Sequence, residues 1–156
     1  THANPFFWHP AIRNKKNDVL KSLGESEGML GFSIYPHHLK DKSECMLEEF
    51  CVMIAKTAEM IGVESIGFGS ALCQNQNDSV VEWMRNGKWT KIVDFGEGSA
   101  KDSGFPTQPS WFKDNTGFDN IILGLKEVGF NSYEIKQIIG ENWMSFLDKS
   151  LGDRSK

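Results

Sequence analysis

Two compact apolar runs on either side of one long amphipathic segment constrain the fold of this chain more than any other feature. MLGFSIY covers residues 29–35 between Gly28 and Pro36, and VESIGFGS covers residues 63–70. Short apolar runs bounded by turn residues are typical of buried strands. A strand, a helix and a second strand in this order predict a parallel sheet with a right-handed crossover. The fold class is therefore α/β.

The segment between the two runs has the pattern of an amphipathic helix. Its apolar residues recur at helical spacing from Leu47 to Ile61. DKSE (residues 41–44) offers capping signals at the start of this helix, and Gly62 ends it. Cys51 is expected on its buried face, because unpaired cysteine is among the most buried residue types.

Three further helices are expected around this unit. One begins near Asn17, an expected N-cap, and ends at Gly24. Two antiparallel helices close the chain: FDNIILGLKEVGF, which Gly129 stops, and NSYEIKQIIGENWMSFLDKSLG, where Asn131 and Glu134 have capping-box spacing. Two strands do not make a sheet with both faces buried, so this architecture requires additional strands.

Residues 71–117 form a long segment with the composition of a loop insertion. It is rich in Gly, Pro and Ser, and its large aromatic residues include Trp83, Trp89, Phe105, Trp111 and Phe112. Loops of more than about 12 to 15 residues are usually functional or disordered, and the aromatic content argues against disorder. We expect an ordered active-site insertion whose rings either roof a substrate pocket or form a small core of their own.

Charge and cysteine content exclude several classes of protein. The net charge is -4 and no basic cluster is present, so neither nucleic acid nor a membrane is expected as a partner. Cys45, Cys51 and Cys73 are an odd number without CxxC spacing, which predicts neither a disulfide framework nor a structural zinc site. A reducing, cytoplasmic location is preferred. Because the sequence begins THANPFF without an initiator Met, we expect a processed chain, a split polypeptide or a fragment.

Three separated stretches, in the same order, resemble one known family. THANPFFWHPAIRNKKNDVLKSLGESEGMLGFSIYPHHL is similar to a region that reads SHSNA, HPRN, DDVLKALAENGG and a strand ending in FYP. IGVESIGFGSALCQ is similar to a pattern that ends in GIGSDFDG, and VGFNSYEIKQIIGENWMSF to closing helices that contain IlGgNflRv. These patterns are those of the membrane (renal-type) dipeptidases, the zinc peptidases of family M19.

The resemblance covers nearly all of the chain but only the C-terminal half of the family. It implies a (β/α)8 TIM barrel, which needs roughly 250 residues. Residues 1–70 would supply the end of strand six and strands seven and eight, and residues 1–156 form a single segment that ends in the closing helices. An N-terminal half, from the same protein or a separate chain, would complete the barrel, and we expect a homo-oligomer of complete barrels.

The resemblance also implies roles for individual residues. His2 aligns with a histidine that binds one of two zinc ions, a role that suits a neutral imidazole; without the resemblance it would be interpreted as a solvated side chain. Arg13 aligns with the arginine that contacts the substrate's C-terminal carboxylate, for which a planar guanidinium is suited, although a surface arginine is the alternative. Most of the zinc ligands would lie outside this chain.

Tyr35 and the histidines that follow it are candidate substrate contacts. Tyr35 aligns with a tyrosine at the family's substrate pocket; the alternative is a packed strand-end tyrosine whose hydroxyl faces water. His37 and His38 form an adjacent pair, and adjacent residues on an extended chain point in opposite directions. We therefore expect only one of them, His38, to line the pocket. Asn142 in GENW matches the family's closing motif, with an expected structural role.

Ala71 stands where the family has a catalytic aspartate beside the dinuclear site. A methyl group accepts no proton, and loss of a general base typically costs about 10²- to 10⁴-fold in rate. The second aspartate of the motif is replaced by Cys73, for which no His/Asn arrangement supports a nucleophilic role. Three explanations are open: an engineered Asp→Ala change, a natural paralogue that binds without turnover, or use of another group. The retained His2, Arg13 and Tyr35 favour the first.

The primary hypothesis is a zinc-dependent hydrolase of a dipeptide or small amide, inactive as written because of Ala71. The main alternative is a non-catalytic barrel that binds a small amino-acid-like ligand or a partner. A free-standing α/β interaction module is the third, although exposed strand edges argue against it.

Overall fold

The structure is a computed structural model that describes residues 2–72, 76–86, 100–101 and 104–152, with only the backbone described at 84–86. Trp89 and Cys73, considered above, lie outside the described residues. None of the helices in the described part of the chain is long and apolar enough to cross a membrane.

Two strands in the described residues pair in parallel, as the sequence predicts. β1 (Leu30–Phe32) and β2 (Ile66–Phe68) align Leu30 with Ile66 and Phe32 with Phe68. Both strands are shorter than the predicted 29–35 and 63–70. Val63–Ser65 is a 3₁₀ turn (η3), and the chain beyond β1 turns into a second one, η1 (Pro36–His38), because proline cannot donate to the sheet.

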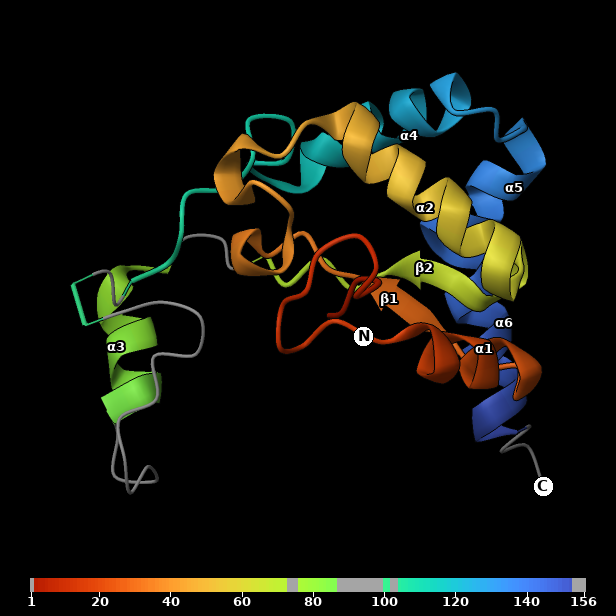
Figure 1. The fold of residues 1–156 in the computed structure, drawn as a ribbon, viewed down its shortest axis with the longest axis horizontal. Helices are drawn as coiled ribbons and strands as arrows, with labels where there is room; N and C mark the ends of the chain where they lie inside the picture. The colour runs from red at the N-terminus through yellow and green to blue at the C-terminus, as the bar shows by residue number, and fades with distance from the viewer. Residues whose placement is uncertain (1, 73–75, 87–99, 102–103, 153–156) are drawn as a thin grey trace.

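The helix that connects the strands covers one face of the sheet (Figure 1). It is α2 (Leu47–Ile61), and Phe50, Cys51 and Ile54 are completely buried on it. The prediction that DKSE caps this helix is wrong: residues 42–44 form their own 3₁₀ turn, η2 (Lys42–Glu44), and α2 starts three residues later without a side-chain cap. Asp41 has φ 60°, a left-handed conformation that interrupts the chain there.

The remaining helices follow the predicted order with shifted ends. α1 (Asn17–Glu25) takes Lys16 as its N-cap, so the prediction that Asn17 is the cap is wrong by one residue. α4 (Phe118–Glu127) is followed by Gly129 at φ 99°, as the stop signal predicts. The capping box is confirmed: Asn131 accepts from the amide of Glu134, whose carboxylate accepts from the amide of Asn131.

The last predicted helix is interrupted by a π-helical turn. α5 (Ser132–Lys136) passes into Gln137–Glu141, which is π-helical, and then into α6 (Asn142–Leu151). A π turn adds a residue to the helical repeat and so changes which side chains face a neighbour.

The residues directly after the π turn bind β2 and the turn before it. Asn142 Nδ2 donates to the carbonyl oxygens of Val63 (2.7 Å) and Ile66 (2.8 Å), and Trp143 Nε1 donates to that of Phe68 (3.0 Å). A Cβ at position 67 would lie 2.6 Å from Trp143 Nε1, which explains the glycine in the middle of the strand. The structural role predicted for Asn142 agrees with these contacts.

Residues 71–117 are more regular than a loop in the parts that are described. They contain α3 (Asp78–Asn86), which Figure 1 shows standing away from the body, and η4 (Asn115–Gly117). Residues 104–117 return to the core, where Trp111 lies 5.1 Å from Phe50 between ring centroids and Phe112 is completely buried. These two rings therefore belong to the main core, whereas Trp83 on α3 is exposed.

Replacing Asn142 with Ala should lower the free energy of unfolding by about 2 kcal/mol, because two buried carbonyl oxygens lose their donor. Chemical denaturation measures this loss. Asn120→Ala is the matched control, since Asn120 makes one exposed hydrogen bond to the Trp111 carbonyl and should cost less than about 0.5 kcal/mol. Equal losses in the two variants would show that Asn142 does not hold β2.

Candidate functional site

Three segments of the chain lie side by side at the sheet. The amide of Ala3 donates to the carbonyl of Gly31 in the middle of β1 (3.3 Å), and just beyond the two strands the amide of Ile34 donates to the Ser70 carbonyl (3.2 Å). His2, Tyr35 and Ala71 lie next to these paired residues. Both strands point toward the side of the molecule that carries η1, η2 and residues 104–117 (Figure 1). Active sites of parallel α/β folds lie at this end.

Asn4 continues the sheet with its side chain. Its Oδ1 accepts from the amide of Ser33 and its Nδ2 donates to the carbonyl of Ser33, both at 3.0 Å. The side-chain amide thus occupies the place of a peptide group on a neighbouring strand. Nδ2 also donates to the His38 carbonyl (3.2 Å), which connects η1 to the same residue. Asn4 is completely buried, so these bonds are shielded from water.

A second asparagine fastens residues 5–16, the loop that carries Arg13. Asn14 Oδ1 accepts from the amide of Asn4 (2.8 Å), and Asn14 Nδ2 donates to the carbonyls of His9 (2.8 Å) and His38 (3.1 Å). Arg13 precedes this anchor and is exposed, so its guanidinium is accessible from solvent. Sequence reasoning missed both asparagines as site residues, although each lies inside a stretch that carries the family resemblance.

His38 is buried and held against Ser33. Its Nδ1 lies 2.8 Å from Ser33 Oγ, which also accepts from the Tyr35 amide at 3.2 Å. Burial lowers the pKa of His38 from 6.5 to about 4, with further contributions from the positive charges of Arg13 and His37. The imidazole is therefore neutral at pH 7.

Residues 36–38 are not the extended chain from which we expected the two histidines to point in opposite directions. They form the 3₁₀ turn η1, and both rings contact Tyr35, with centroid distances of 5.5 Å for His37 and 5.0 Å for His38. Tyr35 is half-buried. The position of its ring is thus defined by its two neighbours on the turn.

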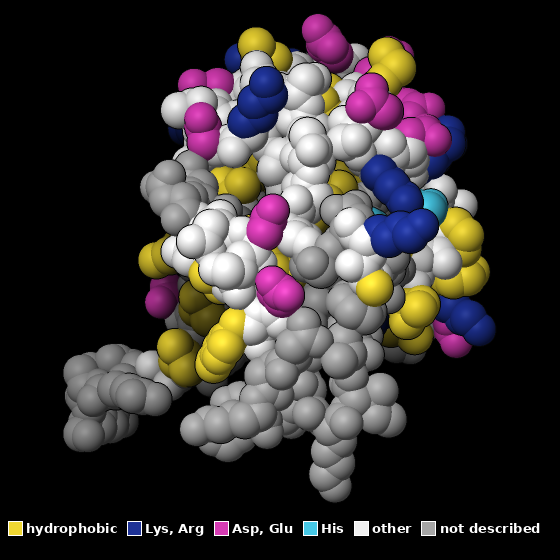
Figure 2. Space-filling model, turned by 90° about the vertical axis from the view of Figure 1, so that its left-hand side faces the viewer, with side chains coloured by type: hydrophobic (Ala, Val, Ile, Leu, Met, Phe, Trp, Pro, Cys, Tyr) yellow, Lys and Arg dark blue, Asp and Glu magenta, His cyan; other side chains and the backbone are white. Residues whose placement is uncertain are grey.

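His2 is exposed and has a left-handed backbone, with φ 61°. Partial desolvation of the ring lowers the pKa of His2, and the positive charges of the amino terminus and of Arg13 lower it further, so the neutral ring is favoured. Figure 2 views the molecule from the side toward which the strands point, where histidine, basic and acidic side chains lie on the same face. A neutral imidazole suits a metal ligand. However, no three His, Cys, Asp or Glu residues in the described part of the chain are grouped so that they could hold a metal.

Ala71 has φ 60° and is half-buried. The left-handed region costs an alanine about 1 to 2 kcal/mol, and aspartate, asparagine and glycine tolerate it best. The backbone at this position therefore fits an aspartate better than it fits the methyl group that is present. The conformation lies directly after Ser70, whose carbonyl pairs with β1, so the residue at 71 leaves the sheet at the candidate site.

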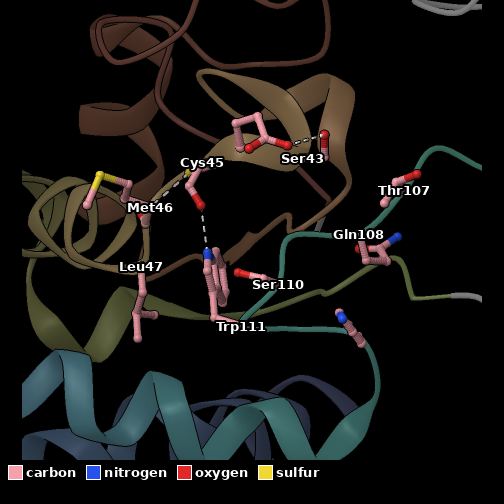
Figure 3. A pocket seen from close by; sticks show the side chains of 10 residues that line it. Ser43, Cys45, Met46, Leu47, Thr107, Gln108, Ser110 and Trp111 are labelled. Carbon is pink, nitrogen blue, oxygen red and sulfur yellow. Dashed lines mark hydrogen bonds between the residues drawn. The ribbon is translucent and has the colours of Figure 1, made fainter.

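A cavity of about 450 Å³ lies between two other segments on the side of the molecule toward which the strands point (Figure 3). Its walls are Ser43, Glu44, Cys45, Met46 and Leu47 from one segment and Thr107, Gln108, Ser110, Trp111 and Lys113 from the other. None of His2, Arg13, Tyr35, His38 and Ala71 contributes to it.

The fold is shared with parts of three solved structures, an amidohydrolase and two metallopeptidases. An amidohydrolase from Pseudomonas aeruginosa superposes with a TM-score of 0.77 at 21% identity, over 94% of this chain and 43% of that protein. A dipeptidase of metallopeptidase family M19 superposes with a TM-score of 0.69 at 21% sequence identity, over 96% of this chain and 36% of that protein. A metallopeptidase from Rhodobacter sphaeroides was solved with a phosphinate mimic of the dipeptide L-Ala-D-Ala. It superposes with a TM-score of 0.68 at 20% sequence identity, over 95% of this chain and 34% of that protein.

The chain spans between about a third and less than half the length of these three proteins. Sequence comparison adds no further relative: no family model and no curated protein matches. The similarity therefore rests on the arrangement of helices and strands.

Stability should depend on pH through His38. The unfolded chain binds a proton near pH 6.5 and the folded chain only near pH 4, so the unfolded state holds more protons between these values. The contribution of His38 to stability is fully present well above pH 6.5 and is lost as the pH falls toward 4, by roughly 3 kcal/mol at most. Urea denaturation from pH 4 to 8 measures the slope. His38→Gln should flatten this slope, and an unchanged slope in the variant would contradict the assignment.

Ala71→Gly should stabilise the protein by about 1 kcal/mol, because glycine adopts a positive φ without the steric cost of Cβ. The matched control is Ala58→Gly in α2, where the same change should destabilise by about 1 kcal/mol. Denaturation midpoints of the two variants should move in opposite directions. A loss of stability at both positions would mean that Ala71 is not strained.

Proposed function

We propose that this chain is the C-terminal part of a metal-dependent hydrolase that cleaves dipeptides or other small amides. The observation that carries the proposal is the shared fold over 94% or more of the chain with an amidohydrolase and two metallopeptidases. The three stretches of sequence that resemble family M19 point to the same class. His2, Tyr35 and Ala71 each lie next to a residue of the paired segments, which is consistent with an active site there.

The complete enzyme in this proposal is a (β/α)8 barrel. This chain supplies the end of strand six, strands seven and eight and the closing helices. The remaining strands come from an N-terminal half, in the same protein or in a separate chain, and complete barrels associate as a homo-oligomer. The short sheet supports this: no further strand pairs with β1 or β2 among the described residues, and only single residues such as Ala3 and Trp143 bond to the carbonyls of the two strands.

The proposed metal is zinc, two ions in the complete site, with His2 as the one ligand from the described residues. Its partly buried, neutral imidazole fits this role. Most of the other ligands would lie outside this chain, as the resemblance to family M19 implies, and the described residues form no complete site by themselves. When bound, a metal pair supplies a water of lowered pKa as the nucleophile.

Arg13 and Tyr35 would hold the substrate. The exposed guanidinium of Arg13, on a loop fixed by Asn14, can accept a carboxylate in a bidentate manner. Tyr35 would line the pocket. His38, the third proposed substrate residue, is buried behind this site, so its contribution would pass through its contacts with Ser33 and Tyr35.

Position 71 would hold the group that accepts and returns protons, and alanine cannot do this. The second candidate function follows from that methyl group: a barrel that binds a small amino-acid-like ligand without cleaving it. The left-handed backbone at Ala71 favours the first candidate, because it is a conformation that suits aspartate. We therefore interpret Ala71 as an Asp→Ala change in an enzyme.

Ala71→Asp should raise amide hydrolysis by about 10²- to 10⁴-fold, because a carboxylate at 71 supplies the missing proton acceptor. The assay uses dipeptides and zinc with the assembled protein, and native mass spectrometry establishes that the N-terminal half and about two zinc ions are present.

Ala71→Asn is the matched control for this experiment. Asparagine tolerates the same positive φ and is nearly the same size, but it is not a base. Hydrolysis in Ala71→Asp and not in Ala71→Asn would support the enzyme. Dipeptide binding without hydrolysis by metal-loaded Ala71→Asp would support the non-catalytic barrel, and a metal-free assembly would contradict both the zinc site and the hydrolase.

A further inference from the structure

The cavity between residues 43–47 and 107–113 has the position of a ligand site. Residues 43–47 follow β1 and lead into α2, and residues 107–113 follow β2 and lead into α4. Both segments therefore belong to the connections that leave the carboxyl ends of the strands, where parallel α/β folds bind ligands. The volume of about 450 Å³ lies in the range of small-molecule sites.

The wall that separates this cavity from the core is rigid. Trp111 Nε1 donates to the Cys45 carbonyl at 2.7 Å, a bond that joins the two segments across the cavity (Figure 3). The indole also packs on Phe50, with ring centroids 5.1 Å apart. Phe112, the next residue, is completely buried. Because both segments are anchored, a ligand would find the wall already formed.

The remaining lining is polar and carries one charge of each sign. Ser43, Thr107 and Ser110 contribute hydroxyl groups, and Gln108 contributes a side-chain amide (Figure 3). Glu44 and Lys113 come from opposite segments, and neither makes an ion pair with any residue that the structure describes. The Ser43 hydroxyl donates to Glu44 Oε1 at 3.5 Å, so this carboxylate has a hydrogen-bond donor but no cation beside it among the described residues. One carboxylate and one ammonium around a hydrogen-bonding cavity complement a molecule that carries both charges.

We propose that this cavity binds a short zwitterionic peptide, with its amino terminus at Glu44 and its carboxyl terminus at Lys113. The peptide backbone would meet the hydroxyl and amide groups of the lining, and small apolar side chains would rest on Trp111, Met46 and Leu47. The site shares no residue with the proposed hydrolytic site and does not depend on hydrolysis. Its occupant is a second peptide molecule or the product of a peptide-cleaving reaction.

Isothermal titration calorimetry with trialanine tests this site in the Arg13→Gln protein, where the carboxylate contact of the hydrolytic site is absent. Glu44→Gln and Lys113→Gln should each raise the Kd by about two- to fivefold, the range for exposed ion pairs. N-acetyl-trialanine should lose its sensitivity to Glu44→Gln, and trialanine amide its sensitivity to Lys113→Gln. The matched controls Glu48→Gln and Lys126→Gln remove the same charges outside the cavity and should leave the Kd unchanged.

The proposal is overturned if trialanine does not bind at millimolar concentration, or if its Kd is the same in the cavity variants and the controls. Blocked peptides that bind as well as trialanine would also overturn it, since the termini would then make no contact with the two charges. None of these results bears on the Ala71→Asp assay, so failure of the cavity site and failure of the hydrolase proposal are distinguishable.

Discussion

The pairing of the Asn4 side chain with the backbone of Ser33 is the interaction on which the candidate site depends. It joins the chain before β1 to the carboxyl end of that strand, and the same amide reaches the carbonyl of His38. Asn14 then connects this point to the loop of Arg13. Because these bonds are buried, each lost partner would leave a polar group without water, and the network favours one arrangement. This hydrogen-bond network fixes the backbone next to His2, Arg13 and Tyr35.

The opposite side of the sheet is fixed by the closing helix. Asn142 and Trp143 bind the carbonyls of β2 that lead to Ser70 and Ala71, so the end of the chain determines where residue 71 leaves the sheet. These contacts on both sides of the sheet explain how the strained backbone of Ala71 is maintained. A backbone held from both sides keeps a left-handed conformation that a methyl side chain does not favour. The conformation suits the acid that the proposed chemistry needs.

Sequence periodicity predicted the parallel strand pair, α2 and the closing helices because each buries a regular apolar face. It failed where a single residue interrupts the pattern. The left-handed backbone of Asp41 turns the chain before α2, and the π turn after Lys136 changes the direction in which Asn142 and Trp143 point. Neither the turn at Asp41 nor the π turn produces a periodic pattern of apolar residues in the sequence. The sequence predicts a loop for the aromatic segment, but Trp111 and Phe112 pack into the main core. Local sequence patterns do not reveal this packing, because the contact partner Phe50 is far away in the chain.

The sequence by itself determined the α/β class, the order of the elements, the ends marked by Gly62, Gly129 and the Asn131 capping box, and the candidates His2, Arg13, Tyr35, His38 and Ala71. These follow from local propensity, periodicity and motif resemblance. Only the tertiary structure decided that His38 is buried against Ser33, that two asparagines fasten the site, and that Glu44 and Lys113 face one cavity. Such features join residues far apart in the chain, and their energies arise from burial and geometry that appear only after folding.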